Sequence, residues 1–232
     1  GLSDRDLRCG PQRPKDTEEA AFAQTCGGHR QVHNNCSGKH TGFLALNQKL
    51  GGDAEYILAD HPVQCATKAV FEEMTGETSP GFGIDGCSAP NFVTSLSGLA
   101  AAMARMAQPK GLGRVRAHAA ENTIDAMMAH PVLVAGQGRA CTELIQALDG
   151  TGVVKTGAEG VFTAILRDQG LGIAVKIEDG ATRAAEAAIA ALLCRVGALE
   201  RNHTAVERRT KAPIRNRRGM VTGHVEAAPW LF

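Results

Sequence analysis

The feature that most limits the fold of this chain is a change in the spacing of its apolar residues near residue 150. Before it, apolar side chains recur at intervals of three and four, which is typical of helices with one buried face. Over residues 150–180 the spacing changes to alternation, clearest at 173–178, and a turn at 168–170 separates two strands. Helical spacing returns over 181–199. This order predicts an α+β fold with helices packed on an antiparallel sheet.

Capping residues, glycines and prolines divide the chain into its expected elements. Residues 1–15 are polar and are expected to form a connecting loop, and the glycine-rich segment 79–90 a loop or tight turn. We expect residues 1–232 to form a single domain. Helices are predicted over residues 16–27, 37–50, 60–76, 96–106, 113–129, 141–148 and 181–199, and strands over 161–167, 173–178 and 219–225.

The composition excludes several classes of protein. The formal net charge is +1 and hydrophobic residues make up 44% of the chain, so neither disorder nor nucleic-acid binding is expected. The basic stretch 208–218 lacks interleaved aromatic residues and is interpreted as a solvated edge. No apolar run reaches the roughly 18 residues of a membrane span, and the first residues form no apolar signal segment. Seven cysteines without a C-x-x-C pair favour a reducing, cytoplasmic location.

The segment His33–His40, which reads HNNCSGKH, is the richest in chemically active side chains. If a helix begins at residue 37, Cys36 lies at its N-terminus, where the helix dipole and free N–H groups favour a thiolate. Lys39 is then in the first turn and its ammonium group favours the thiolate as well. As a metal ligand Lys39 must be the neutral amine, because a ligand needs a lone pair. His40 is expected to give supporting hydrogen bonds.

A second active segment places the carboxylate of Asp85 and the thiol of Cys87 in a glycine-rich turn. Cys36 and Cys87 are 51 residues apart, so their spacing alone does not show that they meet. The sequence leaves two interpretations open. The thiols share a metal ion, or each is a small buried apolar side chain, which is the commoner role of cysteine.

A third segment, Lys155-Thr156-Gly157, lies at the start of the predicted strands. K-T-G on an edge strand is one signature of serine acyl-transfer enzymes related to penicillin-binding proteins. The alternative is an ordinary turn before a strand. The partner signature S-x-x-K is missing, because no serine of the sequence has a lysine three residues later.

Taken together, these segments resemble the rhizobial-type L-asparaginases of the asparaginase II family. The similarity covers nearly the whole chain, and N-N-C-S-G-K-H together with D-G-C is specific. The segments that carry it are Cys9-Gly10-Pro11, Asn34–His40, Asp60–Gln64, Ile84–Cys87, His130-Pro131, Ala135-Gly136, Lys155–Val161 and Lys176–Gly180.

The resemblance implies a fold like that of serine β-lactamases and glutaminases, usually as a homodimer. It implies hydrolysis of L-asparagine to L-aspartate and ammonia, with a serine nucleophile, a lysine base and a zinc ion beside the pocket. By motif, the zinc ligands here are Cys36, Cys87 and Lys39. Asp85 would orient the metal shell or the substrate's amino group.

For the remaining positions, the resemblance assigns Lys155 to the second Ser–Lys pair. It places His40 and Glu159 among the residues that bind substrate.

One departure from the family pattern leaves alternatives open. The S-x-x-K segment of the family lies upstream of the C-G-P motif, so we expect this chain to be N-terminally truncated. A second hypothesis is a catalytically silent relative that binds zinc or a ligand. A third is a redox protein in which Cys36 and Cys87 form a reversible disulfide.

Overall fold

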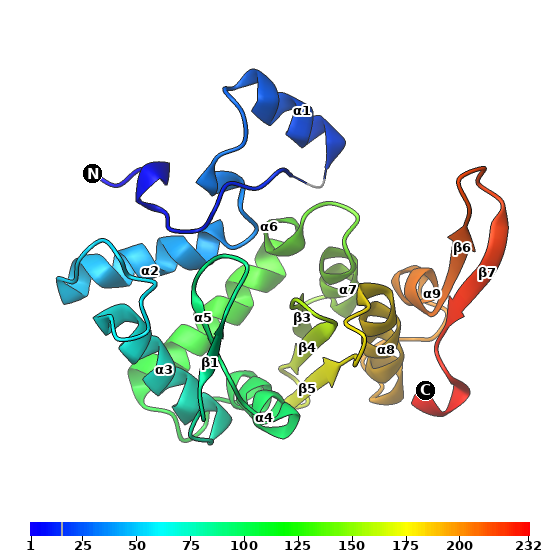
Figure 1. Ribbon diagram of the computed structural model, residues 1–232. Helices are drawn as coiled ribbons and strands as arrows, with labels where there is room; N and C mark the ends of the chain where they lie inside the picture. Colours follow the sequence, from blue (N-terminus) through cyan, green and yellow to red (C-terminus); the bar gives the residue numbers. More distant parts are fainter. Residues whose placement is uncertain (15) are drawn as a thin grey trace. The chain divides into compact units, whose positions relative to one another are not determined.

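The computed structural model describes residues 1–14 and 16–232, which fold into two compact units, Gly1–Thr94 and Ser95–Phe232 (Figure 1). Lys15, at the end of the predicted loop, lies outside the described residues. Helices and small antiparallel sheets make up the chain, which confirms the α+β class. That the whole chain is one domain stays a prediction.

The first unit consists of helices and one short hairpin. The predicted limits of its second and third helices are confirmed to within two residues. Each ends at a glycine with positive φ, Gly51 at +74° and Gly76 at +75°, a conformation that glycine adopts without strain. The elements are 3-10 turns at Asp4–Asp6 and Gln31–His33, α1 (Thr17–Thr25), α2 (Ser37–Leu50), α3 (Pro62–Thr75), β1 (Phe82–Ile84) and β2 (Pro90–Phe92).

The hairpin corrects the expectation that residues 79–90 form only a loop. Strands β1 and β2 pair antiparallel, with Phe82 opposite Phe92 and Ile84 opposite Pro90. Three residues are too few to show the alternation that identifies a strand in sequence, so this pair escaped the prediction. Its turn presents residues 85–89 at the end of the hairpin.

The second unit contains the predicted strand meander, and its central part is confirmed. Strands β3 (Gly152–Thr156), β4 (Val161–Leu166) and β5 (Leu171–Lys176) form an antiparallel sheet in that order. The helices of this unit are α4 (Leu96–Ala107), α5 (Arg114–Ala129), α6 (Pro131–Ala135), α7 (Ala140–Leu148), α8 (Thr182–Arg195) and α9 (Thr204–Thr210).

Helices α4 and α8 pack on this sheet, as the sequence predicts (Figure 1). The backbone of β5 comes so near to α4 that a Cβ at Gly172 would lie 2.2 Å from the amide nitrogen of Ala104. Only glycine fits there. In α8, Ala185, Ile189 and Leu193 are four residues apart and buried, so one face of the helix enters the core.

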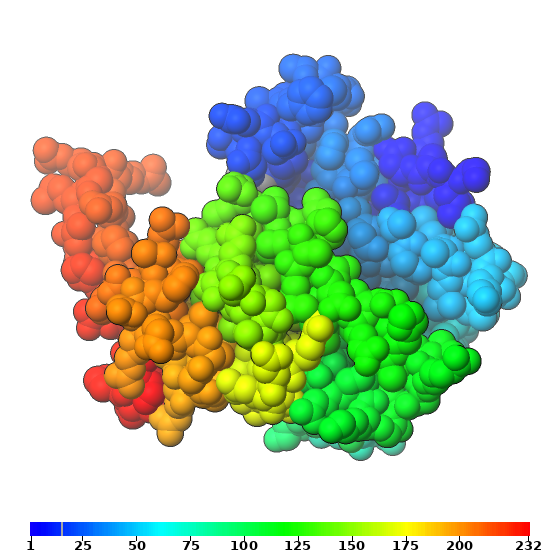
Figure 2. Space-filling view, turned by 180° about the vertical axis from the view of Figure 1, so that it is seen from behind, coloured from blue at the N-terminus to red at the C-terminus, as the bar shows by residue number. Residues whose placement is uncertain are grey.

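The C-terminal part differs most from expectation. The predicted helix 181–199 ends at Arg195, and the basic stretch contains the end of α9 and the strand β6 (Lys211–Arg215). That strand pairs with β7 (Val221–Glu226). The sequence predicts this last strand with a start at residue 219, two residues before the observed one. Four of the five side chains of β6 are exposed, in agreement with a solvated edge, and the hairpin stands out from its unit in the space-filling view (Figure 2).

None of the helices in the described part of the chain combines the length and the apolar character needed to span a bilayer.

Candidate functional site

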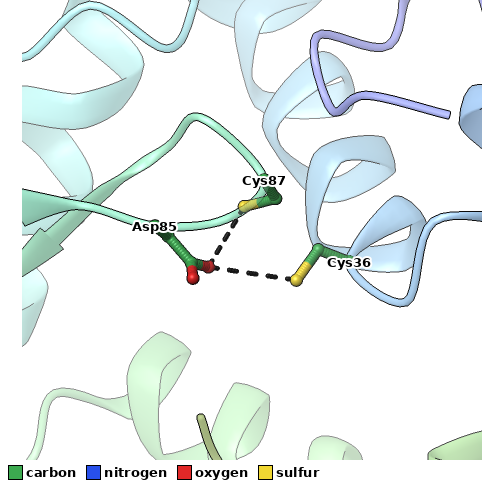
Figure 3. A group of neighbouring side chains, drawn as sticks. All are labelled: Cys36, Asp85 and Cys87. Carbon is green, nitrogen blue, oxygen red and sulfur yellow. Dashed lines mark hydrogen bonds between the residues drawn. The ribbon is translucent and has the colours of Figure 1, made fainter. Parts of the chain in front are cut away.

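The first unit brings together the two cysteine segments that the sequence singles out. Cys36 is the N-cap residue of α2, and Lys39 lies in the first turn of that helix. Asp85 and Cys87 lie in the turn between β1 and β2, opposite the start of α2 (Figure 3). Cys36, at the predicted helix start, therefore meets a thiol 51 residues away in sequence.

Hydrogen bonds hold both segments in place. Asn34, which is buried, accepts the Cys36 N–H through Oδ1 at 2.8 Å and donates from Nδ2 to the carbonyl of Gly10 at 2.8 Å. In the hairpin turn, the Gly86 N–H donates to Asp85 Oδ1 at 2.8 Å. The Ser88 N–H donates to the Asp85 carbonyl at 2.8 Å, with Ser88 at φ +72°. These bonds fix the backbone on either side of the thiols.

The Oδ2 atom of Asp85 is the centre of the cluster. Cys87 Sγ donates to it at 3.1 Å, Lys39 Nζ at 3.0 Å, and Cys36 Sγ lies 4.0 Å away. The ligand atoms of Cys36, Asp85 and Cys87 all lie within 4.8 Å of one another. Two thiols, a carboxylate and an amine therefore converge on one point.

The electrostatics of Cys36 differ from the expectation of a thiolate. Burial raises its pKa to about 11, and the nearby ammonium group of Lys39 only partly opposes this rise. The helix N-terminus favours the thiolate, but loss of water around the sulfur outweighs it in the metal-free protein. The thiol is accordingly protonated at neutral pH.

Lys39 and Asp85 form an ion pair within the cluster. Burial acts to lower the pKa of Lys39, but its hydrogen bonds to Asp85 and Cys87 and the neighbouring thiols raise it overall. Burial acts to raise the pKa of Asp85, but hydrogen bonds from Lys39 and Cys87 lower it overall. At neutral pH the pair is an ammonium beside a carboxylate.

The donor set fits a zinc ion. Zinc takes four ligands, commonly cysteine thiolates with nitrogen or carboxylate oxygen. Cys36 and Cys87 supply two soft ligands, and either Lys39 or Asp85 a third. Asp85 is already a carboxylate and can bind zinc without losing a proton. Lys39 must first give up its ammonium proton.

His40 follows Lys39 on α2 and is buried. It has no exposed surface, and its Nδ1 is 2.8 Å from the hydroxyl of Tyr56, which is also fully buried. A role of His40 in substrate binding stays a prediction. Sequence reasoning missed Tyr56, although it is the only tyrosine of the chain.

Lys155 and Glu159, the other two predicted site residues, belong to the second unit. Lys155 is exposed on β3, an edge strand of its sheet, as the K-T-G signature predicts, and its Nζ donates to the Thr156 carbonyl at 2.6 Å. Glu159 is exposed in the turn before β4 with φ +53°, a left-handed conformation rare outside glycine. The catalytic role of Lys155 and the binding role of Glu159 stay predictions.

A comparison with protein families identifies the family of the chain. A family model described as L-asparaginase II matches residues 1–227, and so includes both units. No curated protein matches the sequence.

Proposed function

Because the chain belongs to the L-asparaginase II family, we propose that it is an amidohydrolase that converts L-asparagine and water to L-aspartate and ammonia. The observation that carries the proposal is the meeting of the family's two cysteine segments at Asp85, in a chain that the family model matches from residue 1 to residue 227. The substrate is then a small amino-acid amide.

The zinc site of this proposal consists of Cys36 and Cys87, with Lys39 as the third ligand. When bound, zinc supplies Lewis-acid chemistry of the kind that polarises an amide carbonyl. Asp85 contributes a negative charge at the centre of the cluster, where in the metal-free protein it holds the Lys39 ammonium group at 3.0 Å. The same carboxylate is suited to hold the α-ammonium group of the substrate, or to orient the ligands around the metal.

The proposed reaction is acyl transfer through a Ser–Lys pair. A serine hydroxyl attacks the side-chain amide carbon while a lysine accepts its proton, ammonia leaves with a proton, and water hydrolyses the acyl-enzyme. Lys155 is the lysine of the second such pair by motif, and its place on an edge strand supports this assignment. A fold like that of serine β-lactamases, a homodimer and a cytoplasmic location belong to the same proposal.

Ammonia release tests the activity directly. The purified, reduced, zinc-loaded chain is incubated with L-asparagine, and with L-glutamine for comparison, and ammonia is measured over time. Cys36→Ser and Cys87→Ser are expected to abolish zinc binding, whereas Cys65→Ser, an exposed cysteine of the same unit, leaves it unchanged. No ammonia from L-asparagine under these conditions contradicts an active hydrolase in this chain.

A second candidate function is supported by the sequence itself. Among residues 1–232 no serine precedes a lysine by three residues, so the S-x-x-K signature does not occur in this sequence. A catalytically silent zinc-binding protein is expected to take up one zinc ion per chain and release no ammonia. Measuring zinc content and ammonia on the same sample therefore separates the two functions.

A further inference from the structure

We propose that Tyr56 is a positioning residue for this site: its hydroxyl holds the His40 ring in the tautomer with hydrogen on Nε2. The proposal rests on the proposed zinc site for its functional consequence. Its structural content, the tautomer of one buried ring, is independent of zinc.

The direction of the hydrogen bond follows from the partners of the hydroxyl. The Arg8 N–H donates to Tyr56 Oη at 2.7 Å, and a backbone N–H has no lone pair with which to accept. His40 Nδ1, at 2.8 Å, is the other hydrogen-bond partner of this hydroxyl among residues 1–14 and 16–232. The phenolic hydrogen is buried and needs an acceptor, and within the described part of the chain His40 Nδ1 provides it.

An accepting Nδ1 fixes the rest of the ring. A neutral imidazole carries one hydrogen, so the hydrogen of His40 lies on Nε2. Burial lowers the pKa of this ring, and the nearby backbone of Cys87 acts in the opposite direction. Nε2 is buried and has no hydrogen-bond partner in the described part of the chain.

His40 belongs to the segment that carries Cys36, and its ring packs on side chains of the same apolar cluster as Cys87. His40 follows Lys39 on α2, and its own N–H donates to the Cys36 carbonyl at 3.0 Å. Its imidazole packs edge-on against the rings of Tyr56 and Phe43, with centroids 5.6 Å apart in both cases.

The position of Tyr56 is itself fixed by burial and by a hydrogen bond to its backbone. Its side chain is fully buried, and the Gln64 side-chain amide, also fully buried, donates to the Tyr56 carbonyl at 2.8 Å. The hydroxyl therefore supports the metal site from outside it. Outer groups of this kind orient metal ligands, and their loss typically lowers metal affinity.

The test is Tyr56→Phe in the full chain, which keeps the ring and removes the hydroxyl. In the reduced, metal-free protein, the ¹⁵N shifts of His40 are expected to change from an Nε2–H pattern to a mixture that includes Nδ1–H. Zinc affinity, measured against a competing chelator, is expected to fall about 10- to 100-fold. Phe43→Leu, which alters a ring packed on the same imidazole without touching the hydrogen bond, is the matched control and keeps the Nε2–H pattern.

A second pair of variants covers the case in which Tyr56→Phe fails to fold. In His40→Gln the side-chain amide nitrogen takes the place of Nε2. In His40→Asn the side-chain amide nitrogen takes the place of Nδ1. We expect His40→Gln to keep zinc affinity close to that of the unchanged protein and His40→Asn to lose it by about 10- to 100-fold.

Each outcome decides a separate point. An unchanged His40 tautomer in Tyr56→Phe overturns the proposal, even if zinc affinity falls, because the hydroxyl then has only a structural role. A changed tautomer with unchanged zinc affinity overturns its link to the metal. If the unchanged protein binds no zinc, the proposed zinc site is wrong, and the tautomer alone decides the role of Tyr56.

Discussion

The ammonium nitrogen of Lys39 lies 3.0 Å from the Oδ2 atom of Asp85, across 46 residues of sequence. The contact joins the first turn of α2 to the β1–β2 turn, and so joins the two segments that carry the thiols. Both side chains are partly exposed, at 40% for Lys39 and 27% for Asp85. The ion pair is thus better placed to arrange the site than to stabilise the fold.

Breaking this pair is expected to affect zinc more than stability. Lys39→Met and Asp85→Asn should each change the free energy of unfolding of the metal-free protein by less than about 1 kcal/mol, because water screens the pair. If Lys39 is the third ligand, Lys39→Met lowers zinc affinity more than Asp85→Asn does. Denaturant unfolding and chelator competition measure the two quantities. A larger loss in Asp85→Asn makes the carboxylate the ligand instead.

Zinc binding is expected to depend steeply on pH. Burial holds the pKa of Cys36 at about 11 in the metal-free protein, so zinc must displace the thiol proton at neutral pH. Affinity therefore rises with pH, by about tenfold per pH unit for each proton released. Calorimetry in buffers of different ionisation enthalpy counts those protons. An affinity that is constant between pH 6 and pH 8 contradicts binding through protonated thiols.

Lys155 is expected to be needed for turnover and not for zinc binding. If it belongs to a Ser–Lys pair, Lys155→Met lowers the rate of ammonia release by about 10²- to 10⁴-fold, the usual contribution of a positioned acid or base. Lys176→Met is the matched control, since Lys176 lies on the opposite edge strand and its Nζ also donates to the carbonyl of the following residue. Equal rates in the two variants remove Lys155 from the mechanism.

The second unit is expected to be sensitive to a single methyl group at Gly172. A Cβ there would lie 2.2 Å from the Ala104 nitrogen and 2.3 Å from the Ala100 carbonyl oxygen, so α4 must move away from β5. Gly172→Ala should lower the free energy of unfolding by about 1–3 kcal/mol or more. In Gly223→Ala, a strand position where Cβ meets Ile214 Cδ1 at 3.9 Å, little change is expected. Thermal or denaturant unfolding compares them.

Much of the fold was predictable because its signals are local. Helix α2 begins and ends at the predicted residues, since Gly51 stops it and polar residues precede it. Strands β4 and β5 were predicted from the apolar pattern over 161–178 and the turn between them. The hairpin β1–β2, the helix α9 and the strand β6 are short, and their stability depends on contacts rather than on an internal pattern.

For the site, the sequence by itself determined which groups were available: two thiols, an amine and a carboxylate in two short motifs, the first at the start of a helix. Only the tertiary structure decided that Cys36 and Cys87 meet, that burial keeps the Cys36 thiol protonated, and that His40 is enclosed against Tyr56. The reason is physical. Helix limits and turns depend on neighbouring residues, whereas loss of water and contact across the chain depend on how distant segments pack.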